Sequence, residues 1–270
     1  MSATRSDSST HHLLAIKIGN TNLGFGVYGA GQLLYAWRAE TCAEKTADEY
    51  AALVLPLLES VNLAPASIQA AALVSVVPPL TDTLREFCLK YLHTDPFIAA
   101  AGMKCGIRIK YDDPRALGAD RLVALVAAKA NYGAPAIVID FGTATTFNAL
   151  NRHGDFVGGA IAPGLNMSAE ALHQFTAKLP RIQVAAPEHA LATNTRDALR
   201  AGIFFGYVGL VEGLTARFKR ELNESDARVI ATGGMAALLK PHCPAIDIVD
   251  RELALDGLRI LYEMNVVKPK

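Results

Sequence analysis

The chain has 270 residues, of which 51% are hydrophobic and 19% charged, and this composition predicts a globular protein with a sizeable core. Lysine plus arginine and aspartate plus glutamate each total 26, so the formal charge is zero and the basic footprint of nucleic-acid-binding proteins is missing. The first twelve residues lack the apolar core of a signal peptide and no apolar run reaches the ~20 residues that span a bilayer, so we expect a cytoplasmic protein without nucleic-acid or membrane partners.

The N-terminal part of the chain reads as strands followed by helices. Residues 13–18 form a short apolar run, GNTN at 19–22 supplies turn residues, and residues 23–28 resume as a strand, so the two strands form a hairpin. The expected elements that follow are a strand at 32–38, a helix at 46–61, a strand at 70–77 stopped by Pro78 and Pro79, and helices at 80–92 and 121–132. This order predicts an α/β fold.

The second part of the chain begins like the first. Residues 136–140 and 147–150 are expected strands with the turn FGTATT between them, which echoes the first hairpin about 120 residues later. The expected elements that follow are helices at 168–179 and 194–222, a strand at 228–232 ending in Gly233-Gly234, and a closing helix at 253–264. We therefore expect a duplicated α/β protein, with a disordered N-terminal tail at 1–12 and domains at 13–120 and 121–270.

The cysteines and histidines point to no catalytic or metal centre of their own. Cys42, Cys88, Cys105 and Cys243 are widely scattered and lack the paired spacing of a zinc site, so we expect four buried, reduced thiols. No cysteine neighbours a plausible base, and the seven histidines form no metal-spaced cluster. Cysteine-based catalysis is therefore not expected.

The two hairpin turns are candidate phosphate-binding sites. A tight Gly/Thr/Asn turn presents backbone N–H groups and short hydroxyls, which together form an anion-binding concavity. One such turn is a weak signal because small-residue hairpin turns are common, but a second turn in register and ATGG at 231–234 strengthen it. The residues expected to hold a nucleotide are Lys17, Ile18, Gly19, Asn20, Thr21, Asn22, Leu23, Gly24, Gly233 and Gly234.

These features resemble the acetate and sugar kinase, heat-shock chaperone and actin superfamily, which binds ATP in a cleft between two duplicated ribonuclease H-like α/β domains. A narrower resemblance, from about Leu13 to Met264, is to the type III pantothenate kinases. It is carried by YDDPRALGADR at 111–121, DFGTATT at 140–146, GGAIAPGL at 158–165 and ATGG at 231–234. The resemblance implies phosphorylation of pantothenate by ATP at the start of coenzyme A biosynthesis, with Mg2+, a monovalent cation (potassium or ammonium) and a homodimer.

The same resemblance assigns roles to single residues. Asp120 of GADR is implied as the general base for the pantothenate hydroxyl, which suits phosphoryl transfer because the protein there mainly positions groups and stabilises charge. Spacing alone leaves open that Asp120 merely caps a helix. Asp140 is implied as the monovalent-cation ligand, with an Asx turn as the alternative, and Thr143 as an ATP contact. The implied pantothenate contacts are Tyr111, Gly118, Ala119, Asp120, Arg121 and Thr195, the last supplied across the dimer interface.

Lys17 departs from the pattern of this family, whose first turn reads D-x-G-N-T. An ammonium in place of a carboxylate removes a group that holds Mg2+ and adds repulsion, although lysine can pair with phosphate oxygens as a point charge. We hypothesise that Lys17 reaches Asp140 and replaces a bound cation. Asn148, where family members often carry aspartate, is a smaller departure. Three readings stay open: a working pantothenate kinase, an impaired nucleotide-binding or regulatory homologue, and a kinase of the same superfamily with another substrate.

Overall fold

The structure is a computed structural model that describes residues 11–266. Most of the tail expected at residues 1–12 lies outside this range. His12, however, is the first residue of a strand and is buried, so the prediction of a disordered tail is wrong for residue 12. It pairs with Gly29 of the next strand, and its Nδ1 lies 3.3 Å from the carbonyl oxygen of Ser67.

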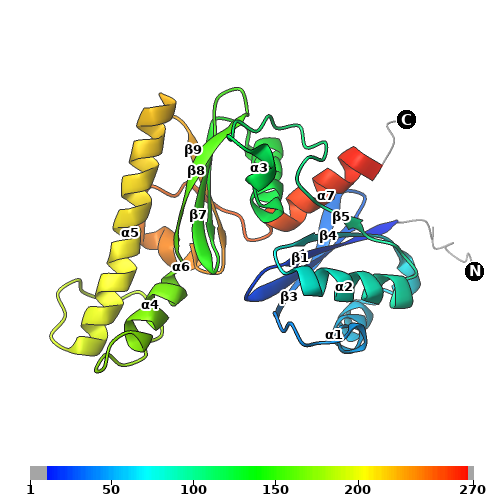
Figure 1. Cartoon of the computed structure of the whole chain (residues 1–270), viewed down its shortest axis with the longest axis horizontal. Helices are drawn as coiled ribbons and strands as arrows, with labels where there is room; N and C mark the ends of the chain where they lie inside the picture. Colours follow the sequence, from blue (N-terminus) through cyan, green and yellow to red (C-terminus); the bar gives the residue numbers. More distant parts are fainter. Residues whose placement is uncertain (1–10, 267–270) are drawn as a thin grey trace, which may run out of the picture. The chain divides into compact units, whose positions relative to one another are not determined.

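The described residues form two compact units, drawn in Figure 1. The first unit contains residues 11–105, 118–123 and 254–266, and the second contains residues 106–117 and 124–253. The units are therefore not contiguous halves of the chain, because the C-terminal helix returns to the first unit. The domain boundary at residue 120 stays a prediction.

The first unit is built on a five-stranded sheet with the strand order β3-β2-β1-β4-β5. Its strands are β1 (His12–Ile18), β2 (Asn22–Gly29), β3 (Gln32–Glu40), β4 (Ile68–Ser75) and β5 (Phe97–Ile98). The first three pair antiparallel, whereas β4 runs parallel to β1 and β5 parallel to β4. Because β1 lies in the middle of the sheet, nearly all of its side chains are buried, and Lys17 is the exception.

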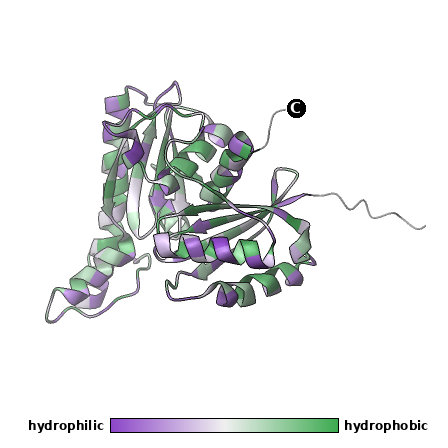
Figure 2. Ribbon diagram, turned by 45° about the vertical axis from the view of Figure 1, so that its right-hand side comes forward, coloured by the Kyte–Doolittle hydropathy of each residue, from purple (hydrophilic) through white to green (hydrophobic). Residues whose placement is uncertain are grey.

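Helices α1 (Ala47–Ser60) and α2 (Pro78–Tyr91) share one hydrophobic core with the first sheet. The apolar face of α1 contributes Tyr50 and Leu58, which are fully buried in that core. On β2, Gly26 lies close to Leu255 of α7 (Leu253–Val266), since a Cβ added there would be 3.2 Å from the leucine side chain. Figure 2 shows strands of both sheets largely in the apolar colour and the helices banded with polar and apolar residues.

The second unit repeats this sheet. Its order, β8-β7-β6-β9-β10, has three antiparallel strands followed by two parallel ones, as in the first unit. Its strands are β6 (Ala136–Phe141), β7 (Ala144–Leu150), β8 (Phe156–Pro163), β9 (Arg228–Gly233) and β10 (Ile248–Val249). The same five-stranded topology occurring twice confirms the expected duplicated ribonuclease H-like α/β fold.

Three α-helices belong to the second unit: α4 (Leu165–Gln174), α5 (Thr195–Leu222) and α6 (Ala236–Leu239). Helix α3 (Ala119–Tyr132) contributes residues to both units. Helix α5 packs its buried Phe204 and Val211 in the same core as Phe147 of β7, and Figure 1 shows it running alongside the second sheet. Short 3-10 turns lie at Pro65–Ser67, Pro114–Ala116 and Lys240–His242.

Helix α5 is long and apolar enough to cross a membrane by length and composition alone. Core helices of soluble proteins meet the same criterion, and 33% of its apolar window is buried. Its N-terminus is capped by Asn194, whose side chain accepts a hydrogen bond of 3.0 Å from the Asp197 N–H. It ends at Asn223, which adopts the left-handed conformation common at helix ends (φ 57°).

Several element boundaries differ from the sequence predictions. Pro78 and Pro79 begin α2 instead of ending β4, because proline fits the first turn of a helix, where its missing N–H loses no hydrogen bond. Strand β8 was not predicted, since its VGGAIAP sequence is rich in glycine and alternates weakly. Helix α4 begins at Leu165 and ends at Gln174, earlier than predicted.

The cysteines are unbonded, and three of the four are buried as expected. Burial raises the pKa of the Cys88 thiol to about 12, so this thiol stays protonated at neutral pH. Cys42 differs from the prediction: it is half-buried just before α1, and its thiol donates to Glu44.

Candidate functional site

The turn between β1 and β2 is closed by backbone hydrogen bonds and a threonine. The Gly19 N–H donates to the carbonyl oxygen of Asn22 over 3.1 Å. A Cβ added at Gly19 would lie 2.9 Å from that oxygen, so a side chain here would push the turn open. Thr41 holds the turn from outside, because its hydroxyl donates to the Gly19 carbonyl (2.7 Å) and its N–H to the Thr21 carbonyl (3.0 Å). Asn20 and Thr21 are left exposed at the tip.

Lys17 is the penultimate residue of the central strand β1, just before this turn. It pairs with Gly24 of β2 and Val74 of β4, and its side chain is half-buried. The ammonium therefore places a positive charge at the end of β1. This charge would attract phosphate oxygens and would repel a divalent cation. Lys17 belongs to the first unit and Asp140 to the second, so the hypothesis that they pair stays a prediction.

In the second unit, the ends of β6, β7 and β9 bring several predicted residues together. Asp140 of β6 lies between Thr146 of β7 and Thr232 of β9 in the sheet. Gly233 has φ +89°, and a Cβ there would be 2.5 Å from Asp140 Oδ1. Only glycine leaves this space beside the carboxylate. The two-residue turn containing Thr143 follows β6 directly, so Thr143 and Gly233 lie at the same end of the sheet as Asp140.

Asn148, the smaller departure, is fully buried on β7. Its side-chain amide donates to the Thr146 hydroxyl over 3.2 Å, and Thr146 pairs with Asp140 in the sheet. The amide therefore acts on the residue next to Asp140 as a hydrogen-bond donor, which a carboxylate could not be.

Gly164 was not predicted as a site residue, yet it lies directly against the second turn. Its N–H donates to the Thr143 carbonyl over 3.0 Å. A Cβ at this position would be 2.2 Å from the Thr143 oxygen and 2.6 Å from the Gly142 oxygen, so no other residue fits without moving the turn. The signal was present in the sequence, because a Pro-Gly pair at a strand–helix junction marks a tight connection.

Asp120 is the second residue of α3 and not its N-cap, so the capping alternative is wrong in that form. A carboxylate in the first turn still interacts favourably with the helix dipole. A Cβ at Gly118 would be 2.6 Å from Asp120 Oδ1, which shows that the carboxylate folds back over this glycine. The neighbouring Arg121 is buried, with 9% of its surface exposed. Gly118, Ala119, Asp120 and Arg121 all belong to the first unit, as does the Gly19 turn.

The other two predicted substrate contacts lie in the second unit. The Tyr111 ring packs on Phe156 with 4.9 Å between the ring centroids. Thr195 is the exposed first residue of α5. The single chain therefore leaves the Thr195 side chain accessible to another molecule.

The described residues fit a nucleotide better than they fit a metal ion held by protein alone. Gly234 leaves open space for a phosphate to approach the backbone, because a Cβ there would have no atom within 4 Å. Between residues 11 and 266 no group of three or more histidine, cysteine, aspartate and glutamate side chains could hold a metal. Mg2+ in kinase sites takes most of its ligands from substrate phosphates and waters, so it does not need such a group of side chains.

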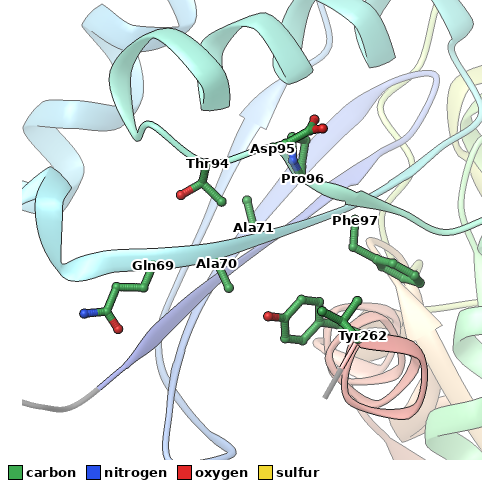
Figure 3. A pocket seen from close by; sticks show the side chains of 9 residues that line it. Gln69, Ala70, Ala71, Thr94, Asp95, Pro96, Phe97 and Tyr262 are labelled. Atoms are coloured by element: carbon green, nitrogen blue, oxygen red, sulfur yellow. The ribbon is translucent and has the colours of Figure 1, made fainter. Parts of the chain in front are cut away.

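Two cavities lie away from these turns. One of about 230 Å3 is at the edge of β4 in the first unit, where Phe97 and Tyr262 face it (Figure 3). The other, of about 420 Å3, lies beside α4 in the second unit and is lined by Glu170 and Arg181, which form a 2.8 Å ion pair. Neither of these two cavities is lined by a predicted site residue.

Comparison with known proteins settles the family. A model described as type III pantothenate kinase matches residues 13–217. The chain belongs to the type III pantothenate kinase family. A type III pantothenate kinase of Geobacillus sp. (strain WCH70) is 48% identical over 256 residues, which cover 95% of this chain and 99% of the relative. The type III pantothenate kinase of Geobacter sulfurreducens is 46% identical over 253 residues, covering 94% and 99%.

Solved structures support the fold of this type III pantothenate kinase family member. A Campylobacter jejuni protein described as a Baf family transcriptional activator is 20% identical, with a TM-score of 0.59 over 93% of this chain and 98% of that one. The ethanolamine utilization protein EutJ from Carboxydothermus hydrogenoformans is 14% identical, with a TM-score of 0.51 over 93% and 89%. At these identities the likeness shows the fold alone.

Proposed function

We propose that this chain is an ATP-dependent kinase that phosphorylates pantothenate to 4'-phosphopantothenate, the first step of coenzyme A biosynthesis. The observation that carries this conclusion is the 48% identity to a type III pantothenate kinase over 95% of the chain. The duplicated fold with a small-residue turn at the same place in each sheet supports the proposal, because such turns can bind the phosphates of ATP. None of the comparisons favours the alternative of a regulatory homologue.

Asp120 is the proposed general base. The pantothenate hydroxyl attacks the γ-phosphorus of ATP, the bond from that phosphorus to the bridging oxygen breaks to release ADP, and the hydroxyl proton passes to the Asp120 carboxylate. The support for this role is the GADR motif at 118–121, which lies within the residues matched by the family model. Gly118, Ala119 and Arg121 would form the wall of the pantothenate pocket, with Tyr111 and Thr195 as further contacts.

The two turns are the proposed phosphate-binding elements. Backbone N–H groups around Gly19 and Thr143 would bind phosphate oxygens, and the glycines at 233 and 234 would let the nucleotide approach β9. Mg2+ would be carried mainly by the phosphates. We further propose that Asp140 binds potassium or ammonium. The alternative is that the Lys17 ammonium takes the place of this cation.

A homodimer is the proposed assembly. Large apolar side chains are exposed on β8, on α4 and in the segment before α5, and the most exposed are Phe175 (86%) and Leu191 (93%). A second copy of the chain would cover them and would bring Thr195 to the partner's substrate. A cytoplasmic location, expected from the sequence, stays a prediction.

The test is a phosphorylation assay with ATP, Mg2+, potassium and pantothenate, run with Asp120→Asn. Loss of the base should lower kcat by about 10²- to 10⁴-fold without changing the fold seen by circular dichroism. Asp113→Asn is the matched control, because Asp113 precedes α3, is exposed and accepts hydrogen bonds from Arg115. Full activity of Asp120→Asn would remove Asp120 from the proposed role.

A further inference from the structure

One peptide unit connects α5 to the second turn. The carbonyl oxygen of Pro163 and the N–H of Gly164 belong to the same planar peptide group, so they are fixed relative to each other and point in opposite directions. The Gly164 N–H donates to the Thr143 carbonyl over 3.0 Å. The Pro163 carbonyl accepts a hydrogen bond from the Tyr207 hydroxyl of α5. The peptide plane is therefore held at both of its ends.

Tyr207 is well placed to fix this plane. Its side chain is buried, with 7% of its surface exposed, and its hydroxyl also lies 3.2 Å from Ser168 Oγ on α4. Helices α4 and α5 pack against each other, so the hydroxyl joins the two helices at the junction of β8 and α4. Hydrogen bonds in such a buried chain polarise and strengthen one another.

Glycine at position 164 makes this support necessary. The close approach of Gly164 to the Thr143 and Gly142 carbonyls excludes a Cβ, as described above. The same absence of a side chain leaves the backbone free to rotate, because glycine accepts conformations that other residues avoid. Without a partner for the Pro163 carbonyl, rotation of the peptide plane would release the Thr143 carbonyl.

We propose that Tyr207 is a positioning residue for ATP binding: its hydroxyl orients the Pro163–Gly164 peptide plane, which in turn holds the Gly142–Thr143 turn in its phosphate-binding shape. The inference rests on the proposed function, in which this turn contacts ATP. Tyr207 acts through the backbone of the β8–α4 junction and does not itself touch the nucleotide.

The experiment compares Tyr207→Phe with the unmodified protein by calorimetric titration with ATP and Mg2+ and by steady-state kinetics. Losing one hydrogen bond should raise both the Kd and the KM for ATP by roughly 2- to 10-fold, with kcat at saturating ATP within twofold. Ser168→Ala, which removes the second partner of the hydroxyl, should shift the ATP Kd in the same direction by less. Gly164→Ala should weaken ATP binding more than either variant.

Tyr132→Phe is the matched control, because the Tyr132 hydroxyl also donates to a partner in the second unit, Asp250, over 2.9 Å. This change should lower the thermal stability and leave the ATP Kd unchanged. If Tyr207→Phe behaves like Tyr132→Phe, with lost stability and an ATP Kd within twofold of the unmodified protein, the inference is overturned. ATP binding without pantothenate phosphorylation would contradict the proposed function alone, since the Kd comparison still decides the role of Tyr207. Failure of the unmodified protein to bind ATP would overturn both.

Discussion

Single glycines determine the shape of both turns. Gly19, Gly164 and Gly233 each lie so close to a carbonyl oxygen or a carboxylate that a Cβ would come within 3 Å of it. Such contacts with backbone cannot be relieved by a side-chain rotation, so these positions tolerate little change. Lys17 is different, because it departs from the family pattern in charge, with an ammonium where the family has a carboxylate.

The first prediction concerns this charge. Lys17→Asp should raise kcat by roughly tenfold and lower the Mg2+ concentration needed for half-maximal rate, because a carboxylate would attract the metal that the ammonium repels. The assay is pantothenate phosphorylation as a function of Mg2+. Lys17→Met serves as the control that removes the charge without adding a carboxylate. Equal rates for the unmodified protein and Lys17→Asp would show that the lysine is tolerated.

A second prediction concerns a buried hydroxyl on α5. Thr215 is 3% exposed, and its Oγ1 has no hydrogen-bond partner among residues 11–266. Thr215→Val keeps the shape and removes the polar atom, so we expect it to increase the free energy of unfolding by about 1 kcal/mol. Thermal denaturation measures this. Thr41→Val should act in the opposite direction, because its hydroxyl donates to Gly19 over 2.7 Å; a loss of stability in Thr215→Val would contradict the interpretation.

At the scale of elements, α5 is attached to the second sheet at several points along its length. Its buried face packs on the core, and Tyr207 reaches the β8–α4 junction. Glu224, the second residue after the end of α5, pairs with Arg152 in the turn between β7 and β8. The Glu224 side chain is 8% exposed, so its carboxylate is more shielded from water than that of Asp95 in the surface pair with Arg85, although the Arg152 side chain is 61% exposed.

This ion pair predicts a pH-dependent stability. The hydrogen bond from Arg152 lowers the pKa of Glu224 below its ordinary value of 4.5. The stabilisation is therefore present above pH 4.5 and is lost as the pH falls through the lower pKa of the folded protein. Thermal denaturation of Glu224→Gln should show a lower Tm than the unmodified protein at neutral pH, with the difference shrinking in acid.

Asp95→Asn is the control for this ion pair, because the side chains of Arg85 and Asp95 are 47% and 61% exposed. Water and salt screen such a pair, so its removal should change the Tm less than Glu224→Gln does. A Tm difference for Glu224→Gln that stays constant down to the acid range would show that the carboxylate charge is not the cause.

At the scale of the whole molecule, the same five-stranded topology occurs twice, and each copy carries its small-residue turn after its central strand. The most exposed of the large apolar side chains, Ile161 (65%), Phe175 (86%) and Leu191 (93%), all lie in the second unit. Five large ones lie between residues 161 and 191 of the second unit, on or near β8 and α4. A monomer rarely leaves so many apolar side chains in one stretch uncovered.

We therefore predict that the protein in solution has twice the 28.8 kDa mass of the chain. Light scattering coupled to size-exclusion chromatography measures the mass. The double change Phe175→Glu with Leu191→Glu should shift it toward the single chain, because two charges would be buried in the interface. Leu34→Glu, on the exposed strand β3, should leave the mass unchanged. A single-chain mass for the unmodified protein would contradict the homodimer.

Sequence by itself determined the class of fold, the family and the positions of both turns. Local signals were enough for these features, because the apolar runs of β1 and β6 and the Gly/Thr/Asn residues after them specify strand and turn without help from distant residues. The long helix at 194–222 was predicted to within one residue, since Asn194 is a strong capping residue. The motifs that carry the family resemblance are also local.

Tertiary structure alone decided the rest. Strands β5 and β10 have two residues each and exist only because β4 and β9 offer a free edge for pairing, so no periodic pattern could show them. The return of α7 to the first unit and the contact of Gly164 with the Thr143 turn depend on residues distant in sequence. Such features are set by packing and by hydrogen bonds between separate segments, which a pattern along the chain does not encode.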